Sequence, residues 1–439
     1  MFRWHIAVFI GAFLNVMFYF LICFTGFAIT NYVVPPGTLG IIPTPNYTNW
    51  DTAATNIQDA VDVAIHNDNT VVMVTNGNYA LTNEISIRKL ITVRSANGLG
   101  ATFINGNYPN MTNRCVYMGY NNASLLVEGF TISNGFASSS SNGNGGGVYM
   151  INGQLRNCRV CGNNSTNFGG GIYMTNGYSM VTNCEIYGNW AAAVGGGIYA
   201  EGSNVKILNS TIHNNIVSND VSLFGGMGGG AGVFIKSGTM QYCQVYSNAC
   251  PNPYQPFAGG VYGEQGSTIR NCLIYTNTAK YGAGLYCRKT RWVENCTIAG
   301  NASSDGSGGV YIGLDSTSDR VKFQNTIIYM NYAVSSSNFS WHPSAGTNST
   351  FTNCCFAPIN YPNSAMCSGS IDGNPRYVSS QIANYRLSKW SPCINSGTNQ
   401  PWMSGMPDLD GRLRIDRYSG IVDMGVYEYS PQGTIFTVR

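Results

Sequence analysis

The chain has 439 residues, of which only 10% are charged, and its formal net charge is +3. Because 44% of the residues are apolar, the composition excludes a disordered chain, which needs low hydrophobicity and high net charge. The basic residues form no run, so the sequence lacks the electrostatic footprint of nucleic-acid binding, and we expect no nucleic-acid partner.

Residues 1–28 carry an export signal. Arg3 and His5 precede an uncharged stretch from Ile6 to Phe24, and a small-x-small cleavage site ends at Ala28. We predict a signal peptide, with an uncleaved membrane anchor as the alternative because the run is long enough to span a bilayer. Both interpretations predict a secreted, extracellular or cell-surface protein that contacts a membrane only through this segment, if it is retained.

The next segments predict the start of a β-rich domain. We expect a linker over 29–54 and then a capping helix over 55–65, whose apolar residues follow helical spacing and whose N-cap is Thr55 or Asn56. The expected strands that follow lie at 71–74, 85–87, 91–93 and 125–132.

Two phrases then recur in phase. A glycine-rich phrase ending in an aromatic residue, such as GGGIY or GAGLY, appears seven times at intervals of 24 to 35 residues. Each copy is followed by the phrase Asn-Cys-x-Ile/Val-Tyr-x-Asn or a close variant of it. This period is typical of a solenoid of short strands. We predict an all-β, single-stranded parallel β-helix over 55–350, with the last rungs and an irregular C-terminal cap over 351–439.

In such a coil, like residues of successive rungs stack in columns. The bend inside the second phrase is expected at an asparagine that tolerates left-handed backbone, such as Asn157 or Asn183. Inward-facing thiols are predicted at Cys158, Cys184, Cys243, Cys272 and Cys296. A structural ladder of side-chain amides is predicted at Asn163, Asn189, Asn215, Asn248, Asn277, Asn301 and Asn331.

The outward aromatic residues form the candidate ligand-binding column. Two interpretations remain open: the rings bind sugar or a partner surface, or they support neighbouring rungs. This column comprises Tyr149, Tyr173, Tyr199, Phe234, Tyr262, Tyr286 and Tyr311. A second ring column is expected at Tyr187, His213, Tyr246, Tyr275 and Tyr329.

The charged residues give a weaker indication of a functional site than the aromatic columns do. Glu201, Lys236, Glu264 and Arg288 alternate in sign on successive rungs, which predicts an inter-rung salt ladder rather than a catalytic pair. A lyase on this fold would need carboxylates for Ca²⁺ and a basic group. A longer loop offers Asp315, Asp319 and Arg320 as weak catalytic candidates, although we favour a solvated loop as the explanation of these residues.

The C-terminal segment holds the weak metal candidates. Asp408, Asp410 and Asp423 could supply oxygens for Ca²⁺, or they could form hydrogen-bonded turns with Arg414 as an ion-pair partner. We expect no other cofactor. Among the cysteines outside the ladder, Cys367 and Cys393 are the best candidates for a disulfide.

Several stretches resemble known families. NIQDAVDVAIHNDNTVVMVTNGNY, KLITVRSANGLGATFING and VEGFTISNG resemble right-handed parallel β-helix proteins of the pectate-lyase-like superfamily. The GGGIY and NCxI repeats resemble polymorphic-outer-membrane-type repeats. NYRLSKWSPCINSG, PDLDGRLRI and VDMGVYEY are similar to the choice-of-anchor Q segment. The resemblance implies a right-handed coil.

The sequence favours a structural or adhesive role, in which aromatic and asparagine stripes are presented to carbohydrate, to a cell-surface partner or to other copies of the chain. A polysaccharide lyase or glycoside hydrolase is the first alternative, and a self-assembling fibre or trimeric spike is the second. No catalytic residue is assigned with conviction, so enzymatic activity stays open. An enzyme would need a cleft with paired carboxylates beside Arg or Lys.

Overall fold

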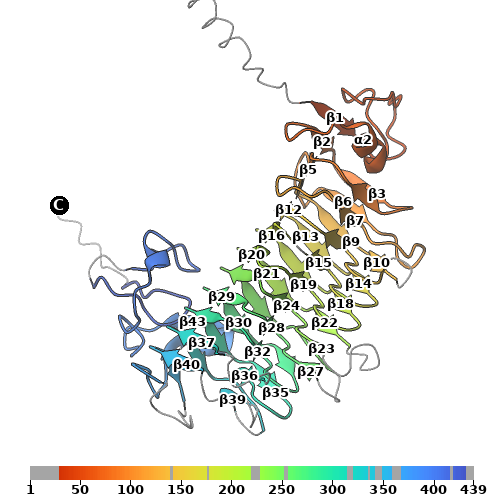
Figure 1. The fold of residues 1–439 in the computed structure, drawn as a ribbon. Helices are drawn as coiled ribbons and strands as arrows, with labels where there is room; N and C mark the ends of the chain where they lie inside the picture. Colours follow the sequence, from red (N-terminus) through yellow and green to blue (C-terminus); the bar gives the residue numbers. More distant parts are fainter. Residues whose placement is uncertain are drawn as a thin grey trace, which may run out of the picture.

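The computed structural model describes residues 29–138, 142–175, 177–218, 228–251, 256–313, 320–334, 337–341, 349–357, 367–415 and 419–431. The predicted signal peptide or anchor lies outside these ranges. Within them, no helix is both long and apolar enough to span a bilayer. The chain coils into a rod of parallel strands, with a short helix at its N-terminal end and an irregular segment beside its C-terminal half (Figure 1).

Helix α2 (Ile57–Val63) closes the first rung, as predicted. It begins after Asn56, whose side-chain oxygen accepts the backbone N–H of Gln58 at 2.8 Å. Ile57, Ala60 and Val61 are buried, and the helix contacts the first strands of the coil. The cap therefore covers strand edges that would otherwise be open to aggregation.

Two expectations near this end differ from the structure. Residues 29–54, expected as a linker, include strand β1 (Thr30–Val33), which pairs with β2 (Val71–Val74). Pro35 and Pro36 follow β1 closely, so its alternation is too short to recognise. The strand expected over 125–132 is two strands, because Gly129 makes a corner with a φ of 82°.

Three parallel sheets run along the rod. Sheet A has twelve strands, namely β1, β2, β5 (Thr92–Ser95), β8 (Leu126–Glu128), β12 (Gly153–Arg156), β16 (Ser179–Thr182), β20 (Lys206–Leu208), β25 (Thr239–Gln241), β29 (Thr268–Arg270), β33 (Trp292–Glu294), β37 (Lys322–Gln324) and β40 (Thr350–Thr352). Sheet B has eleven strands, namely β3 (Gly77–Ala80), β6 (Thr102–Asn105), β9 (Thr131–Ser133), β13 (Arg159–Cys161), β17 (Glu185–Tyr187), β21 (Thr211–His213), β26 (Gln244–Tyr246), β30 (Leu273–Tyr275), β34 (Thr297–Ala299), β38 (Ile327–Tyr329) and β41 (Cys355–Phe356). Sheet C has ten strands, namely β4 (Ile85–Ile87), β7 (Val116–Met118), β11 (Val148–Met150), β15 (Ile172–Thr175), β19 (Ile198–Glu201), β24 (Val233–Lys236), β28 (Val261–Glu264), β32 (Leu285–Arg288), β36 (Val310–Ile312) and β39 (Phe339–Trp341).

Shorter elements complete the rungs and the cap. A four-stranded sheet lies between sheets B and C in chain order and contains β10 (Phe136–Ala137), β14 (Asn164–Ser165), β18 (Trp190–Ala191) and β22 (Ile216–Val217). Two parallel pairs join β23 (Gly228–Gly229) to β27 (Pro256–Phe257) and β31 (Thr278–Ala279) to β35 (Ala302–Ser303). The C-terminal segment contains the antiparallel pair β42 (Tyr377–Ser379) and β43 (Asn384–Leu387), with 3₁₀-helices η3 (Ser380–Ile382) and η4 (Pro401–Met403).

One apolar core fills the rod, and the inward thiols belong to it. Five cysteines of the repeated phrase are at most 3% exposed, and all are free thiols: Cys158, Cys184, Cys243, Cys272 and Cys296. A small apolar side chain fits this inward position because each rung repeats the same spacing. The columns expected from the alternation are therefore present.

The amide ladder runs unbroken along the inside of the turn after sheet B. Asn163 Nδ2 donates to Asn189 Oδ1 at 3.0 Å, and each later member donates to the next at 2.9 to 3.0 Å as far as Asn331. All seven side chains are at most 3% exposed. An asparagine stripe presented to carbohydrate is therefore contradicted for this column, because the amides satisfy one another inside the turn.

Close packing between rungs explains why the repeated phrase contains glycine. A Cβ at Gly197 would lie 2.6 Å from the carbonyl oxygen of Gly232 and 2.9 Å from Nδ2 of Asn215. The backbone of one rung therefore approaches the next rung and the amide ladder too closely for a side chain. This contact explains why the two sequence phrases stay in phase.

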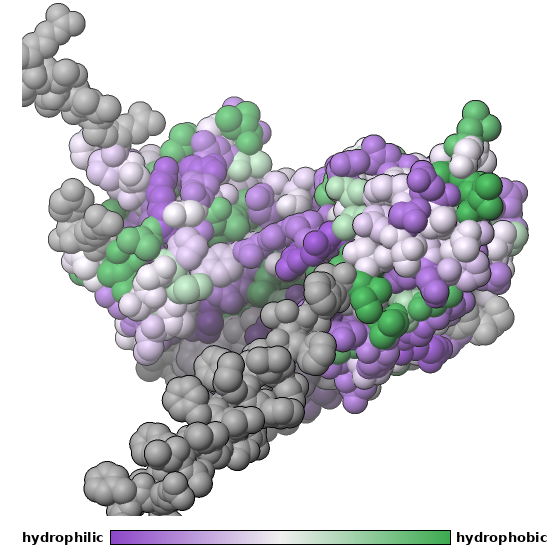
Figure 2. All heavy atoms as spheres, turned by 90° about the horizontal axis from the view of Figure 1, so that it is seen from above, coloured by the Kyte–Doolittle hydropathy of each residue, from purple (hydrophilic) through white to green (hydrophobic). Residues whose placement is uncertain are grey.

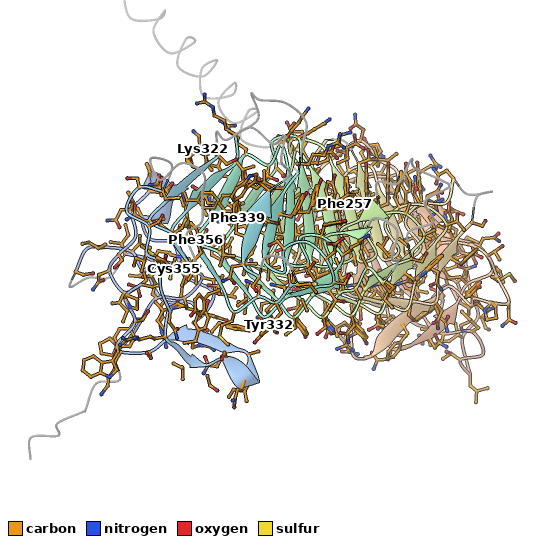
Figure 3. All side chains as sticks on the ribbon, turned by 90° about the horizontal axis from the view of Figure 1, so that it is seen from below. Phe257, Lys322, Tyr332, Phe339, Cys355 and Phe356 are labelled. Atoms are coloured by element: carbon orange, nitrogen blue, oxygen red, sulfur yellow. The ribbon has the colours of Figure 1, made fainter. Side chains whose placement is uncertain are left out.

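The last rungs are filled by aromatic residues, and β40 and β41 extend the coil. The rings of Phe323 and Phe351 stack at 4.6 Å, and Phe339 meets Phe351 edge-on at 4.9 Å. Phe339 and Phe356 are labelled at this end in Figure 3. The large rings replace the smaller aliphatic residues of the central rungs.

The C-terminal cap docks along sheets A and B. Asn325 Nδ2 donates to the carbonyl of Thr398 at 2.9 Å, and Val426 N donates to Thr297 Oγ1 at 3.1 Å. The disulfide considered for Cys367 and Cys393 is not formed, because both are free. Cys393 packs instead with Cys355 of the last rung.

Candidate functional site

The predicted ligand-binding column lies on the outer face of sheet C. Its rings are in register, and neighbouring ring centroids are 4.7 to 5.5 Å apart from Tyr149 to Tyr311. In the middle of the column, Tyr199, Tyr262 and Tyr286 are only 3 to 7% exposed. The column thus supports successive rungs by stacking.

Non-repeating residues also cover this column. Phe168 stacks on Tyr199 at 5.0 Å, and Phe257 lies 4.6 Å from Tyr286. Because neighbouring rings occupy the ring faces, a sugar could reach mainly edges and hydroxyls here. Ligand binding by this column stays a prediction.

The charged residues beside the column form the predicted ion pairs. Lys236 Nζ lies 2.7 Å from Glu201 Oε1, and Arg288 Nη1 lies 3.6 Å from Glu264 Oε1. Tyr199 also donates its hydroxyl to Glu201 at 2.8 Å. Burial alone would raise the pKa of Glu201, but Lys236 and Tyr199 hold it below its usual value. An ionised, paired carboxylate is poorly suited to act as a general acid.

The structure describes only one of the three weak catalytic candidates. Asp315 and Asp319 lie outside them, and Arg320 is exposed at the start of the next described segment. The lyase chemistry considered for this loop therefore stays a prediction.

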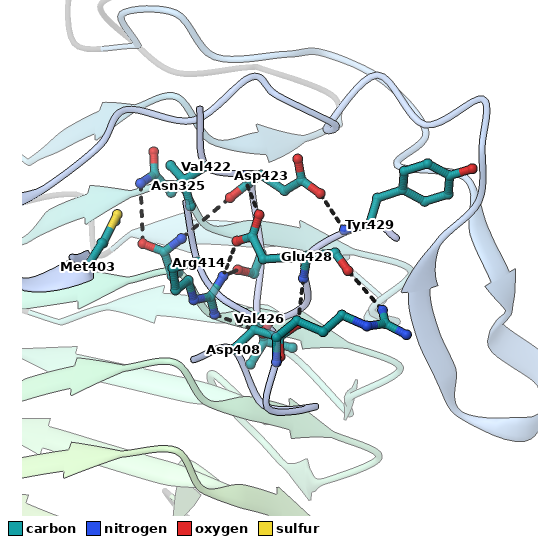
Figure 4. Close-up of polar contacts among 12 residues, drawn as sticks. Asn325, Met403, Asp408, Arg414, Val422, Asp423, Val426, Glu428 and Tyr429 are labelled. Carbon is teal, nitrogen blue, oxygen red and sulfur yellow. Dashed lines mark hydrogen bonds and ion pairs between the residues drawn. The ribbon is translucent and has the colours of Figure 1, made fainter. Parts of the chain in front are cut away.

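The weak calcium candidates lie in the cap, where N–H groups approach their carboxylates (Figure 4). Asp408 accepts the backbone N–H groups of Asp410, Arg412 and Glu428, each at 2.8 Å. Asp423 accepts two further backbone N–H groups at 2.6 Å. Among the described residues, no three His, Cys, Asp or Glu side chains are placed to hold a metal ion.

The ion pair considered for Arg414 is formed with Glu428. Arg414 is fully buried, and its Nη1 lies 2.9 Å from Glu428 Oε1. The guanidinium also donates to the carbonyls of Gly425 and Val426 at 2.9 and 2.8 Å. The carboxylates and this arginine therefore hold the cap in shape.

Sheet B presents the second ring column on a more accessible face. His213 lies between Tyr187 and Tyr246, with centroid distances of 5.0 and 4.8 Å and nearly parallel planes. Beyond Tyr187 the column continues as Cys161, which is smaller than a ring. Among the described residues, the other face of Tyr187 has no ring partner. Hydrophilic side chains gather across the middle of the side of the molecule seen in Figure 2.

An ion-pair chain flanks these rings. Glu185 contacts Arg159 Nε at 2.8 Å and His213 Nε2 at 3.4 Å. Burial alone would raise the pKa of Glu185, but Arg159 and His213 hold it below its usual value. Sequence analysis missed this cluster, although Arg159 and Glu185 occupy the same position of the repeated phrase.

A cavity of about 640 Å³ adjoins this face, between sheets A and B and the cap. Its sheet side comprises Leu208, Asn209, Ser210, Thr211, Gln241, Tyr242 and Gln244. Its cap side comprises Met406, Pro407, Asp408, Leu409 and Gly411. Because the cap residues are distant in sequence, repeat analysis could not locate this cavity. We define the open face of sheet B as the outer surface of β13, β17, β21 and β26 together with this cavity.

Comparisons with known proteins agree with this architecture. Residues 196–372 match the family described as right handed beta helix region. The fold is a right-handed parallel β-helix. The crystal structure of the pectate lyase Pel9A is similar, with a TM-score of 0.55 and 14% identity over 91% of this chain and 96% of that chain.

Two further solved structures are more distant. The mannuronan C-5 epimerase AlgE6 A-module of Azotobacter vinelandii has a TM-score of 0.33 and 16% identity over 73% of this chain and 94% of that chain. A pectin methylesterase from Aspergillus niger has a TM-score of 0.32 and 12% identity over 79% of this chain and 91% of that chain. No curated protein matches the sequence. The comparisons establish the fold alone.

Proposed function

We propose that this chain is an exported carbohydrate-binding β-helix with a structural or adhesive role, and that it holds a glycan along the open face of sheet B. Export is proposed from the apolar stretch within residues 1–28. The supporting observation for binding is the cavity beside Thr211 and Gln244, whose side chains make no hydrogen bond to the described residues. Amides, hydroxyls and aromatic edges are suited to sugar hydroxyls and C–H faces.

The face also has the right shape for a linear polymer. Successive rungs of a parallel sheet lie about 4.8 Å apart, so equivalent side chains form an evenly spaced track. The ionised groups on the track are paired with each other, as shown by Glu185 and Arg159. Binding by hydrogen bonds and ring contacts would therefore not require a charged glycan.

A glycan array with the full chain tests this proposal. The Thr211→Arg variant should weaken binding at least tenfold, because it places a long side chain on the open face of sheet B. The matched Thr175→Arg variant places the same side chain on sheet C and should bind like wild type. Equal losses in both variants, or no glycan bound by wild type, would refute the proposal.

A polysaccharide lyase or glycoside hydrolase is the second candidate, because Arg159, Glu185 and His213 place a carboxylate between two basic groups. Incubation with polysaccharides followed by detection of unsaturated or reducing sugars tests this function. Product that disappears in Glu185→Gln would replace the adhesive proposal.

A further inference from the structure

One corner residue breaks the repeat. The bend between sheets A and B has left-handed backbone in every central rung, and seven of these residues are asparagines with φ of 47 to 53°: Asn157, Asn183, Asn209, Asn271, Asn295, Asn325 and Asn353. The rung between Asn209 and Asn271 has Tyr242 instead, with a φ of 56°. A bulky residue is disfavoured in this conformation, whereas asparagine is tolerated. The turn itself does not explain the tyrosine.

Tyr242 instead lines the cavity between the sheets and the cap. Its hydroxyl oxygen is buried and has no hydrogen-bond partner among the described residues. A residue with strained backbone whose buried hydroxyl also lacks a hydrogen-bond partner is costly to keep, which indicates a role beyond the turn.

The polar groups around Tyr242 are also unengaged. The side chains of Asn209, Thr211, Gln241 and Gln244 line the same cavity, and none makes a hydrogen bond to another described residue. These groups offer both donors and acceptors from two adjacent rungs. The opposite wall is largely apolar, as at Met406.

The cavity has little net charge to offer a ligand. Asp408 is its charged lining residue, and its two oxygens already accept three backbone N–H groups at 2.8 Å. Among the described residues, no lysine or arginine lines the cavity. The lining therefore favours an uncharged, hydroxyl-rich ligand over a uronate. The volume of about 640 Å³ lies within the range of small-molecule sites.

We propose that this cavity is a subsite for one or two neutral sugar units of a glycan, with the ring of Tyr242 as its aromatic wall. This inference rests on the proposed carbohydrate-binding function and adds the ligand class and the residue that selects it. The glutamines and Thr211 bind ring hydroxyls, and Met406 covers an apolar sugar face. A glycan that continues beyond the cavity lies over the rings of sheet B.

Affinity measurements on the full chain test this subsite. The probes are labelled neutral gluco-, manno- and galacto-oligosaccharides, with oligogalacturonate as the acidic counterpart. Wild type should bind at least one neutral probe more tightly than oligogalacturonate. Tyr242→Asn should weaken that binding at least tenfold, whereas Tyr178→Asn, which removes an exposed tyrosine elsewhere, should leave it unchanged.

Stability measurements separate binding from folding. Tyr242→Asn restores the corner asparagine, so its Tm should equal or exceed that of wild type. Tyr242→Phe keeps the ring and should bind within about twofold of wild type, because the buried hydroxyl does not face the ligand. Unchanged neutral-probe affinity in Tyr242→Asn, or preference of wild type for oligogalacturonate, would overturn the subsite while leaving the proposed function intact. Wild type that binds no glycan would overturn both.

Discussion

The outer faces of sheets B and C carry equivalent ring columns but differ in accessibility. On sheet C, Tyr262 is 3% exposed because residues such as Phe257 cover the middle of its column, whereas Tyr149, Tyr173 and Tyr311 are partly exposed. On sheet B, Tyr187 and Tyr246 remain only half-buried. The same repeat thus produces a column whose middle is covered on sheet C and a column whose rings stay partly exposed on sheet B.

The difference lies in the non-repeating segments. Turns before sheet C fold over its rings, whereas the cap covers only one part of sheet B, where Tyr385 meets Tyr275 at 5.7 Å. The cavity forms where that cover ends. A repeat therefore predicts columns, but the irregular segments determine which column can meet a ligand.

Detaching the C-terminal cap from the coil should cause the largest change, because the cap covers part of sheet B. Arg414→Met leaves Glu428 buried without its ion-pair partner, which should cost about 3–5 kcal/mol in the free energy of unfolding. Sheet B would then be exposed along its length, and a fluorescent probe of apolar surface should bind. Chemical denaturation measures the loss, and Arg412→Met, at a more exposed position, should cost under about 1 kcal/mol.

Removing one ring from each column should distinguish a ring that stabilises the coil from a ring that also binds glycan. Tyr262→Ala should cost about 3–5 kcal/mol, because it opens a cavity in a buried stack. Tyr246→Ala should cost less, about 1–2 kcal/mol, and should reduce glycan affinity. Denaturation curves and affinity measurements check both. Equal destabilisation by the two changes would contradict the difference between the faces.

Lowering the pH should remove a smaller stabilising contribution, which comes from Glu185 on sheet B. The folded-state pKa of Glu185 is depressed, so its stabilising contribution is present above its unfolded pKa and is lost as pH falls through the folded value. Because the pair is partly exposed, we expect about 0.2–1 kcal/mol. Glu185→Gln should lower Tm near pH 6 but not near pH 2. A pH-independent difference in Tm would contradict this assignment.

The coil and its columns could be predicted from the sequence, because register follows directly from repeated residues such as Asn189 and Tyr173. The exposure of those columns could not be predicted, since it depends on contacts between residues far apart in the chain. The pairing of Thr297 with Val426 has no sequence signal. The sequence does contain a signal for Tyr242, because this tyrosine replaces the asparagine that precedes cysteine in other copies of the phrase.

Hydroxyl-radical footprinting of the full chain with and without its bound oligosaccharide tests the central claim most directly, because it reports side-chain accessibility on both faces at once. We expect the glycan to protect Met406, Tyr242 and Tyr246 from oxidation. Oxidation of Tyr149 and Tyr311 on sheet C should be unchanged. Protection of the sheet C tyrosines with no change at Met406 and Tyr242 would contradict it.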